Sequence, residues 1–434
     1  MKPIYIVDGV RTPFLKSRNR PGPFSASDLA TGAGKALLAR APFEGSDVDE
    51  VILGCAASSV DEVNIARVAS LRMGCGIKVR AWTVMRNCAS GMQSIDSAIA
   101  NMIAERSHLV LAGGVDALSR APLLYSDAMV NWFADFAAAK GTAQKLGRFA
   151  RLPLRSLLSP VIGIMRGLTD PVCGLLMGQT AENLAHRFGI TRRQMDEFAA
   201  RSHERVIRSQ ENGWLTRDHD GLPAEMVPVF DNAGKLYSED DGVRKDSTAD
   251  NLAKLRPFFD RNYGNVTAGN SSQITDGAVW LALADEDGVR RHNLKPIARI
   301  VDTQWSGLDP AQMGLGPVYA ATPILKRHGL KLNDLDAWEI NEAFAAQVLG
   351  CTAAWQDSEF CRTELGLEGP MGALDMEKLN IDGGAIALGH PVGASGTRIV
   401  LHLIHVLKRT GGRRGMAAIC IGGGLGGAML VELV

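Results

Sequence analysis

The sequence lacks the features that mark a membrane-spanning or secreted protein. No stretch approaches the roughly 18 consecutive apolar residues that a transmembrane helix needs. The N-terminus, residues 1–8, enters a strand-like pattern at once, without a long apolar leader or an amphipathic Arg/Ser-rich one. We therefore expect a soluble protein of the cytoplasm.

Paired cysteines and an excess of one charge are also lacking. The seven cysteines show neither paired spacing nor a CxxC motif, which indicates a reducing compartment and argues against a zinc site. Lys and Arg together number 47, as do Asp and Glu, so the composition gives no general attraction to nucleic acid. The length of 434 residues, 46% of them hydrophobic, is enough for a large core in two or three domains.

The region around Cys88 carries the first candidate for chemistry. Residues 80–85 predict a short buried strand, and apolar residues at helical spacing from 92 to 103 predict a helix after it. Cys88 then lies at or near the helix N-terminus, where unpaired N–H groups and the helix dipole favour a thiolate. A lone cysteine is more often a buried structural residue, so other parts of the chain must decide between these interpretations.

Strand and helix patterns alternate in the first and last parts of the chain. This alternation predicts an α/β layer architecture with a mainly parallel sheet. We expect strands at 4–10, 50–53, 80–85, 109–114, 296–303, 337–340, 381–388, 415–420 and 428–434, and helices at 27–40, 64–72, 92–103, 320–328 and 395–407. The small residues 88–91 and 393–396 each precede a helix, which hints at a duplicated unit.

The middle of the chain has a different character. Charged helical patterns such as 191–210 dominate residues 119–275, which we interpret as a domain inserted between core regions 1–118 and 276–434. Within it, residues 136–169 hold six cationic and no acidic side chains among many apolar ones. Such a segment fits a membrane interface or a partner protein, or it covers the core as a solvated basic loop. Pro153 and Pro160 would interrupt a continuous helix there.

Three further reactive groups occur in the last third of the chain. Asn341 follows a predicted strand, His390 precedes a small-residue turn and a helix, and Cys420 ends a strand before three glycines. Residues beyond the carboxyl ends of strands face the ligand crevice of α/β sheets, so one pocket could hold these groups together with Cys88.

The set is suited to acyl transfer through a thioester. A histidine can activate a cysteine nucleophile, a second cysteine can move a proton to or from carbon, and exposed N–H groups can stabilise an oxyanion. Taken singly, His390 is more often a structural histidine and residues 422–424 are more often a turn.

Together, these segments resemble the thiolase family, and the resemblance covers essentially the whole chain. The motifs that carry it are residues 4–13, N-C-A-S-G-M-Q at 87–93, G-G-V-D at 113–116, M-G-Q-T-A-E-N at 177–183, V-T-A-G-N-S-S at 266–272, N-E-A-F at 341–344, G-H-P at 389–391 with G-A-S-G at 393–396, and C-I-G at 420–422. The resemblance implies a five-layered αβαβα core of two similar halves, with an inserted loop domain.

The resemblance also implies a reaction and a role for each motif. Thiolases join or cleave the bond between the α and β carbons of a 3-ketoacyl-CoA. By position, Cys88 is the acylated nucleophile, His390 activates it, and Cys420 handles the α-carbon proton of acetyl-CoA. His390 and a water on Asn341 form one oxyanion hole, and the N–H groups of Cys88 and Gly422 form the other. The positions that match substrate contacts are Met177, Met313 and Phe344 for the acyl and pantetheine pocket, and Ser272 and Arg244 for CoA.

The departures from the family pattern point to degradative thiolysis. Leu176 replaces a histidine that many biosynthetic thiolases have before Met-Gly, and Asn251 replaces a serine that often contacts CoA. Residues 351–379 and the basic, apolar segment 136–169 look like those of thiolase subunits in fatty-acid β-oxidation trifunctional complexes. This implies CoA and acyl-CoA as substrates, no permanently bound cofactor, a homodimer or dimer of dimers, and a hydratase/dehydrogenase partner subunit.

Three alternatives stay open. The first is biosynthetic acetoacetyl-CoA formation by an acetyl-CoA C-acetyltransferase. The second is a ketoacyl-synthase type of condensation, which Cys420 argues against because those enzymes place a histidine or an asparagine there. The third is an inactive lipid-binding member, which retention of all four reactive groups disfavours.

Overall fold

The computed structural model describes residues 2–219 and 221–434, and in this part of the chain ten strands form one large sheet. In spatial order the strands are β12 (Ala337–Ile340), β13 (Arg414–Ile421), β14 (Leu425–Leu433), β11 (Ala298–Gly307), β1 (Ile4–Arg11), β10 (Thr275–Asp285), β5 (Leu109–Ala117), β3 (Glu50–Gly54) and β4 (Arg80–Val84), with β2 (Leu15–Lys16) beside β10. The two halves of the sheet are joined where β1 meets β11, and these strands pair only over Ile4–Ile6 and Ala298–Ile300.

The sheet is mixed, so the expectation of a mainly parallel sheet is wrong. β3 runs parallel to β4 and β5, and β12 runs parallel to β13. The pairs β1–β10, β1–β11, β10–β5, β11–β14 and β13–β14 are all antiparallel. Strands such as β13 and β14 follow each other through a tight turn that reverses the chain, whereas only a crossover connection allows parallel pairing.

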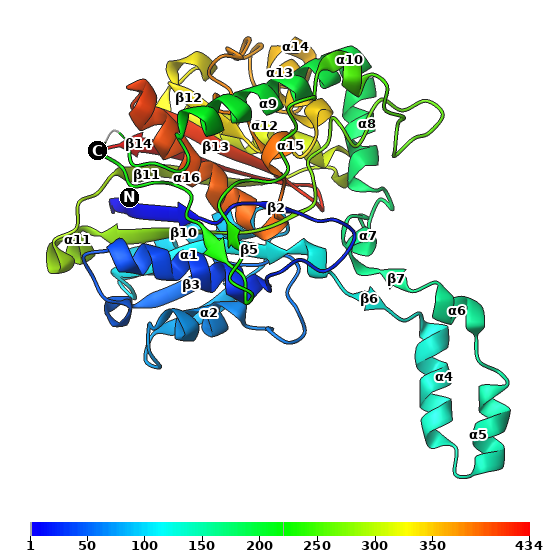
Figure 1. Ribbon diagram of the computed structural model, residues 1–434. Helices are drawn as coiled ribbons and strands as arrows, with labels where there is room; N and C mark the ends of the chain where they lie inside the picture. Colours follow the sequence, from blue (N-terminus) through cyan, green and yellow to red (C-terminus); the bar gives the residue numbers. More distant parts are fainter. Residues whose placement is uncertain (1, 220) are drawn as a thin grey trace.

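Helices cover the outer faces of the two halves and also fill the space between them (Figure 1). The helices are α1 (Ala26–Arg40) and α2 (Ile65–Met73) outside β1–β10–β5–β3–β4, α3 (Ser90–Ile103) and α16 (Val392–Thr410) in the middle, and α12 (Gly316–His328) outside β11–β14–β13. One apolar cluster joins α3 and α16 to both halves of the sheet, and two more lie under the outer helices. This arrangement has the five layers that the thiolase resemblance implies.

The first turns of α3 and α16 pack closely against each other at their glycines. A Cβ atom added at Gly91 would overlap Thr397 Oγ1 and lie 2.7 Å from the carbonyl oxygen of Gly393. A Cβ atom at Gly396 would lie 2.7 Å from the backbone nitrogen of Met92 on the opposite helix. The two small-residue turns noted in the sequence are therefore placed side by side.

Most predicted elements are confirmed, but two details are wrong. β4 is not buried: it pairs only with β3, and Trp82 is 36% exposed at this edge of the sheet. Residues 381–388 form a loop and the short helix α15 (Ala385–Leu388) instead of a strand. The Glu342 carboxylate accepts a hydrogen bond from Ile386 N, and Gly383 has a φ of 83°, so this backbone is held in a turn. The strand β10 was not predicted.

The residues between β5 and β10 form two parts. The first is a group of segments that packs over the body, with α8 (Met177–Arg187), α9 (Arg192–Asn212), β8 (Val229–Phe230), β9 (Leu236–Tyr237) and α10 (Ala249–Leu252). The second, which we call the arm, stands away from the body (Figure 1). It consists of β6 (Leu123–Leu124), α4 (Asp127–Ala138), α5 (Thr142–Phe149), α6 (Leu154–Leu158), β7 (Val161–Ile162) and α7 (Gly163–Gly167).

The arm is helical but interrupted, as the two prolines predict. Pro153 lies between α5 and α6, and Pro160 lies between α6 and β7. Across the described residues, no helix has the length and apolar character needed to cross a membrane.

The contact between α3 and α16 makes a prediction about Gly91. Gly91→Ala should lower the free energy of unfolding by about 1–3 kcal/mol, because the added methyl group overpacks a backbone contact. Gly147→Ala is the matched control, since a Cβ atom at this helical glycine of the arm meets nothing within 4 Å. Urea unfolding of both variants measures the difference, and equal midpoints would contradict the proposed tight contact.

Candidate active site

The four sequence-predicted catalytic residues come from both halves of the core. Cys88 lies two residues before α3, Asn341 directly follows β12, His390 lies between α15 and α16, and Cys420 is near the end of β13. The helix contact brings the Cys88 turn to the segment after His390. Asn341 lies next to the strand of Cys420, because its backbone N–H donates to the carbonyl oxygen of Ala418 at 3.0 Å.

Cys88 is half-buried, and its electrostatics differ from the sequence expectation. Burial raises the pKa of the Cys88 thiol, and the carboxylate of Asp116 adds to that rise, while backbone groups of Gly422 and of Cys88 itself lower it. Backbone groups favour the thiolate, as expected of this turn, but desolvation outweighs them and the net pKa is raised. The lowering by Gly422 places the C-I-G turn beside the Cys88 sulfur.

Cys420 is fully buried and close to Cys88. Burial raises the pKa of Cys420 well above its usual value, and the charges of Cys88 and Cys351 raise it further. Only one of these neighbouring thiols can therefore ionise readily at a time, and each thiolate disfavours the other. A proton held this firmly on Cys420 is available for donation to a carbanion.

His390 is oriented by a serine on the following helix turn. The Nδ1 atom of His390 lies 2.6 Å from Ser395 Oγ, which also lies 3.1 Å from the carbonyl oxygen of Pro391. Since the carbonyl only accepts, Ser395 donates to Pro391 and accepts from Nδ1–H. This leaves Nε2 of His390 unprotonated, buried and without a partner in the structure. Burial and the charge of Arg398 lower the pKa of His390 to about 4, so the ring is neutral at neutral pH.

The side chain of Asn341 carries the clearest sign of a ligand site. It is completely buried, yet neither its Oδ1 nor its Nδ2 atom has a hydrogen-bond partner in the structure. An unpaired buried amide costs about 1–3 kcal/mol per group, so these atoms are available to a ligand or a bound water. Asn341 and Nε2 of His390 thus provide unused hydrogen-bonding atoms in the same core.

Of the predicted acyl-pocket residues, one contacts the turn at Gly422 and two lie in the apolar cluster beside it. Met177 begins α8 half-buried, and its Sδ atom lies 3.3 Å from where a Cβ of Gly422 would be. Phe344 follows Asn341, is 8% exposed and packs edge-to-face on Phe259. Met313 is buried in the same apolar cluster. These side chains give the site an apolar wall.

The two predicted CoA contacts lie on different segments, and no direct hydrogen bond joins them among the described residues. The backbone N–H of Ser272 donates to the carbonyl oxygen of Ala343 at 2.9 Å, which ties it to the Asn341 motif. The backbone N–H of Arg244 donates to Nδ1 of His203 at 3.1 Å. Burial and the charge of Arg244 lower the pKa of His203 to about 4, so His203 acts as a neutral acceptor.

Three residues that position the site were not predicted from the sequence: Ser395, Asn87 and Asp116. Asn87 donates from Nδ2 to the carbonyl oxygen of Gly422 at 2.8 Å. The buried Asp116 accepts hydrogen bonds from Ala57 N and Gly393 N, so it ties the loop after β3 to the start of α16. Burial raises the pKa of Asp116 to about 6. All three residues lie within the motifs that carry the family resemblance, and membership of these motifs is the sequence feature that could have identified them.

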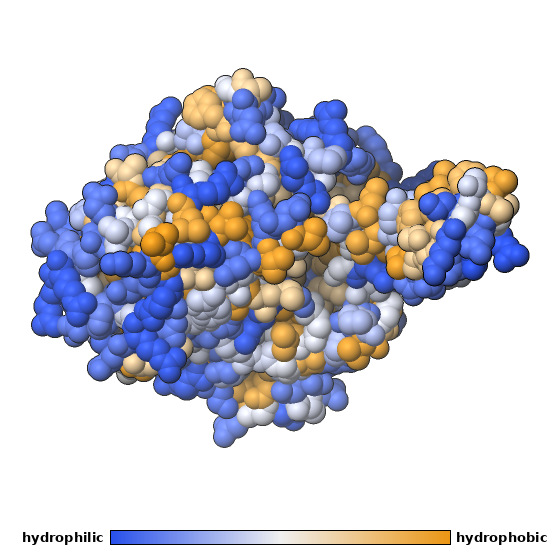
Figure 2. Space-filling model, turned by 90° about the horizontal axis from the view of Figure 1, so that it is seen from below, coloured by the Kyte–Doolittle hydropathy of each residue, from blue (hydrophilic) through white to orange (hydrophobic). Residues whose placement is uncertain are grey.

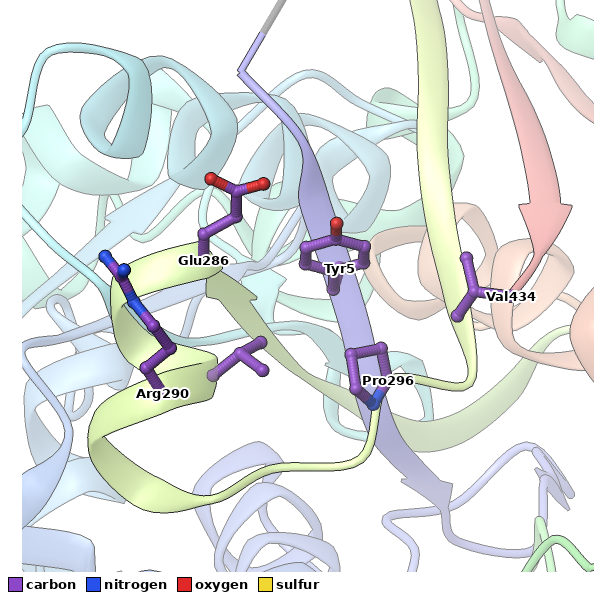
Figure 3. Close-up of a pocket in the computed structure, with 6 residues that line it drawn as sticks. Tyr5, Glu286, Arg290, Pro296 and Val434 are labelled. Carbon is purple, nitrogen blue, oxygen red and sulfur yellow. The ribbon is translucent and has the colours of Figure 1, made fainter.

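Two other features lie away from these residues. Among the described residues, one group has metal-ligand geometry: His108, Asp285 and Asp287. Lys2 forms an ion pair with Asp285 at 2.9 Å, so part of this group's charge is already neutralised. A shallow hollow of about 640 Å³ adjoins the same end of β10 (Figure 3). Its lining residues are Tyr5, Glu286, Val289, Arg290, Pro296 and Val434.

The hollow is separate from the candidate site. The first residue of β10, Thr275, contacts the position of a Cβ at Gly389, whereas its last residue, Asp285, pairs with the start of β1 near Tyr5. The 11 residues of β10 span roughly 35 Å at about 3.3 Å per residue.

Family models match the chain almost from end to end. The model described as "Thiolase, N-terminal domain" matches residues 4–287, and "Thiolase, C-terminal domain" matches residues 294–433. The 3-ketoacyl-CoA thiolase of Yersinia pestis (strain Pestoides F) is 37% identical over 431 residues, which cover 99% of this chain and 97% of the relative.

Solved structures give the same result. Human mitochondrial 3-ketoacyl-CoA thiolase in complex with CoA superimposes with a TM-score of 0.83 at 36% identity, covering 100% of this chain and 98% of the other. The acetyl-CoA acetyltransferase of Bacillus anthracis superimposes with a TM-score of 0.82 at 35% identity, covering 100% and 99%.

The bond between Ser395 and His390 makes a prediction about the reactivity of Cys88. Ser395→Ala should slow iodoacetamide labelling of Cys88 at pH 7 by about 10-fold or more. Ser395 accepts the hydrogen bond from Nδ1–H of His390, and without it the proton is no longer held on Nδ1 and Nε2 is less available as a base. Ser209→Ala, which removes a buried hydroxyl bonded within α9, should label at the wild-type rate. Peptide mapping by mass spectrometry gives both rates, and equal labelling of the two variants would remove this role from Ser395.

Proposed function

Because this chain belongs to the thiolase family, we propose that it uses CoA to cleave 3-ketoacyl-CoA in fatty-acid β-oxidation. The products are acetyl-CoA and an acyl-CoA shortened by two carbons. The observation that carries the assignment to this site is the pair of unused buried groups, the Asn341 amide and Nε2 of His390. Asn341 adjoins the strand of Cys420, and the segment after His390 contacts the helix turn that follows Cys88. CoA and acyl-CoA are the substrates, and the proposed chemistry needs no permanently bound cofactor.

The first half of the reaction forms an acyl-enzyme. His390 takes the proton from Cys88, and the thiolate attacks the keto carbon of the substrate. The bond between the α and β carbons breaks, its electron pair moves to the α carbon, and the Cys420 thiol protonates that carbon. Acetyl-CoA leaves, and the shortened acyl group stays on Cys88.

The second half returns the enzyme to its resting state. The Cys420 thiolate takes the proton of the incoming CoA thiol, and the CoA sulfur attacks the thioester on Cys88. The shortened acyl-CoA leaves, and the Cys88 thiolate recovers its proton from His390. The N–H groups of Cys88 and Gly422 stabilise the oxyanion on the acyl carbon, while His390 and a water on Asn341 stabilise the one on acetyl-CoA.

Degradation is preferred over the alternatives on two grounds. Leu176, before Met177, puts an apolar side chain where a polar one marks many biosynthetic members. Cys420 provides a thiol where a ketoacyl-synthase-type condensation would use a histidine or an asparagine. Synthesis of acetoacetyl-CoA is the reverse reaction at the same groups, and the B. anthracis structure has that type of name. Thiolysis rates over a ladder of chain lengths separate the two: a preference for acetoacetyl-CoA alone would favour synthesis.

The two cysteines should separate in their half-reactions. Cys88→Ala should form no acyl-enzyme. Cys420→Ala should still be acylated, but should exchange the α-proton of acetyl-CoA about 10²–10⁴-fold more slowly, because it lacks the group that moves this proton. Mass spectrometry of the intact protein measures acylation, and deuterium loss from labelled acetyl-CoA measures exchange. Wild-type exchange in Cys420→Ala would exclude it as the base.

A second copy of the chain is the proposed partner at the edge of the sheet. β4 pairs on one side only, and the large apolar side chains Val60, Val63 and Met85 nearby are 87%, 74% and 66% exposed. An open edge with exposed apolar residues supports pairing with another strand. We therefore propose a homodimer through β4, alone or within a dimer of dimers.

The proposed location of the protein is the reducing cytoplasm, and its seven cysteines, all free thiols, support this.

The proposed dimer can be tested at its apolar rim. Val63→Lys with Met85→Lys should shift the protein to the monomer, because two charges would lose solvent on association. Sedimentation velocity at micromolar concentration compares this variant with Ile77→Lys, where an equally exposed apolar residue lies before β4. An unchanged sedimentation coefficient for the first variant would place the contact elsewhere.

The arm is proposed to lie on an anionic lipid surface. Its apolar side chains are widely exposed, for example 71% at Leu146, 59% at Phe149 and 78% at Leu158. They are accompanied by the six cations of residues 136–169, of which only Arg148 forms an ion pair in the described structure, with Asp135. Figure 2 shows apolar and polar surface side by side on this projection. Apolar groups flanked by cations suit the boundary between headgroups and acyl chains.

Charge reversal in the arm tests this proposal. Lys145→Glu, Arg151→Glu and Arg155→Glu together should abolish salt-sensitive sedimentation with phosphatidylserine vesicles, since each cation contributes about 1 kcal/mol near such a surface. Lys35→Glu, Lys78→Glu and Lys295→Glu make the same charge change on the body and should leave it intact. Failure of the wild type to bind vesicles at low salt would contradict the proposal. Co-purification with a hydratase/dehydrogenase subunit in place of vesicle binding would assign the arm to that partner.

A further inference from the structure

The turn before Cys88 and the turn after Cys420 are joined by a side-chain hydrogen bond. Asn87 Nδ2 donates to the carbonyl oxygen of Gly422 at 2.8 Å, and the two residues are 335 positions apart in the chain. A second contact between these turns is that of the Gly422 N–H with the Cys88 sulfur. None of the catalytic roles assigned above uses Asn87.

The backbone around Asn87 fixes the direction of its side chain. Asn87 has a φ of 43°, in the left-handed region that asparagine tolerates better than most residues. Its carbonyl oxygen accepts hydrogen bonds from the backbone N–H of Ser90, at 3.1 Å, and from Ser90 Oγ, at 2.7 Å. The amide of Asn87 therefore extends from a rigid turn.

The partner turn has no side chains of its own to hold it. Gly422, Gly423 and Gly424 follow one another, and the last two have φ values of 93° and 75°. The carbonyl oxygen of Gly424 accepts a hydrogen bond from Leu308 N at 2.8 Å, which fixes the far end of the turn. Asn87 fixes the near end, where the N–H of Gly422 lies beside the Cys88 sulfur.

We propose that Asn87 is a positioning residue that holds the N–H of Gly422 at the correct separation from the N–H of Cys88. These two donors belong to different halves of the molecule, and a shift of either turn would spoil an oxyanion hole that needs both. The inference rests on the proposed thiolase reaction for its kinetic consequence. The expected effect on the reactivity of the Cys88 sulfur follows from the geometry alone and does not depend on turnover.

Asn87→Gly is the sharpest variant, because glycine keeps the left-handed backbone and removes only the amide. Its kcat should fall about 10- to 100-fold, while the KM for CoA stays within about twofold, since Asn87 is not assigned a contact with CoA. The pH midpoint for iodoacetamide labelling of Cys88 should move upward, because the N–H of Gly422 that favours the thiolate becomes less well placed. Asn293→Gly is the matched control: another exposed asparagine with a positive φ, of 51°, at the end of α11 (Glu286–His292).

The outcomes separate positioning from general structure. A second variant, Asn87→Asp, keeps the shape but faces the Gly422 carbonyl with an acceptor, so it should reproduce the fall in kcat and the shifted labelling midpoint. It also serves as the test if Asn87→Gly does not fold. A wild-type kcat and labelling midpoint in either folded variant would overturn the inference. If the wild type itself does not thiolyse 3-ketoacyl-CoA, the proposed function fails, and the labelling midpoint alone decides the role of Asn87.

Discussion

The backbone contact between the first turns of α3 and α16 is the constraint on which the rest of the structure depends. Each helix presents glycine to the other, so the chain segments that carry Cys88 and His390 approach more closely than side chains would permit. β1 and β11 pair over a short stretch only, and these two helices lie in the layer between the two halves of the sheet. Pairing the two similar halves in this way creates one site from two strand–turn–helix units.

Burial then decides the protonation states in that site. Cys88 and Cys420 both have raised pKa values and His390 has a lowered one, so thiols and imidazole are all neutral at rest. Charge develops only when substrate arrives and a proton moves. Nε2 of His390 is free to accept the first proton, and the Asn341 amide is free to hold a water. Polar groups that are preorganised in a water-poor site are worth more than the same groups in solvent.

Much of this molecule could be predicted from local patterns. Cys88 was found at a strand end before a helix, His390 before a small-residue turn and a helix, and Cys420 at a strand end before three glycines. The properties that could not be predicted depend on distant segments. The pKa of Cys88 is raised by surroundings assembled from the whole core, and the Asn87–Gly422 bond joins opposite ends of the chain. The strand β10 was missed because it is buried on both faces, so no polar alternation marks it. The antiparallel pairs likewise follow from long-range topology.

The neutral resting state of the Cys88 and Cys420 thiols has a consequence for their resistance to oxidation. Peroxides and other oxidants attack the thiolate form of cysteine, which proceeds through sulfenic acid to states that no cellular thiol can restore. A nucleophile that stays protonated until its substrate is bound exposes very little thiolate to such reagents between turnovers. The burial that raises the pKa of Cys88 thus also reduces the fraction of thiolate that an oxidant can attack.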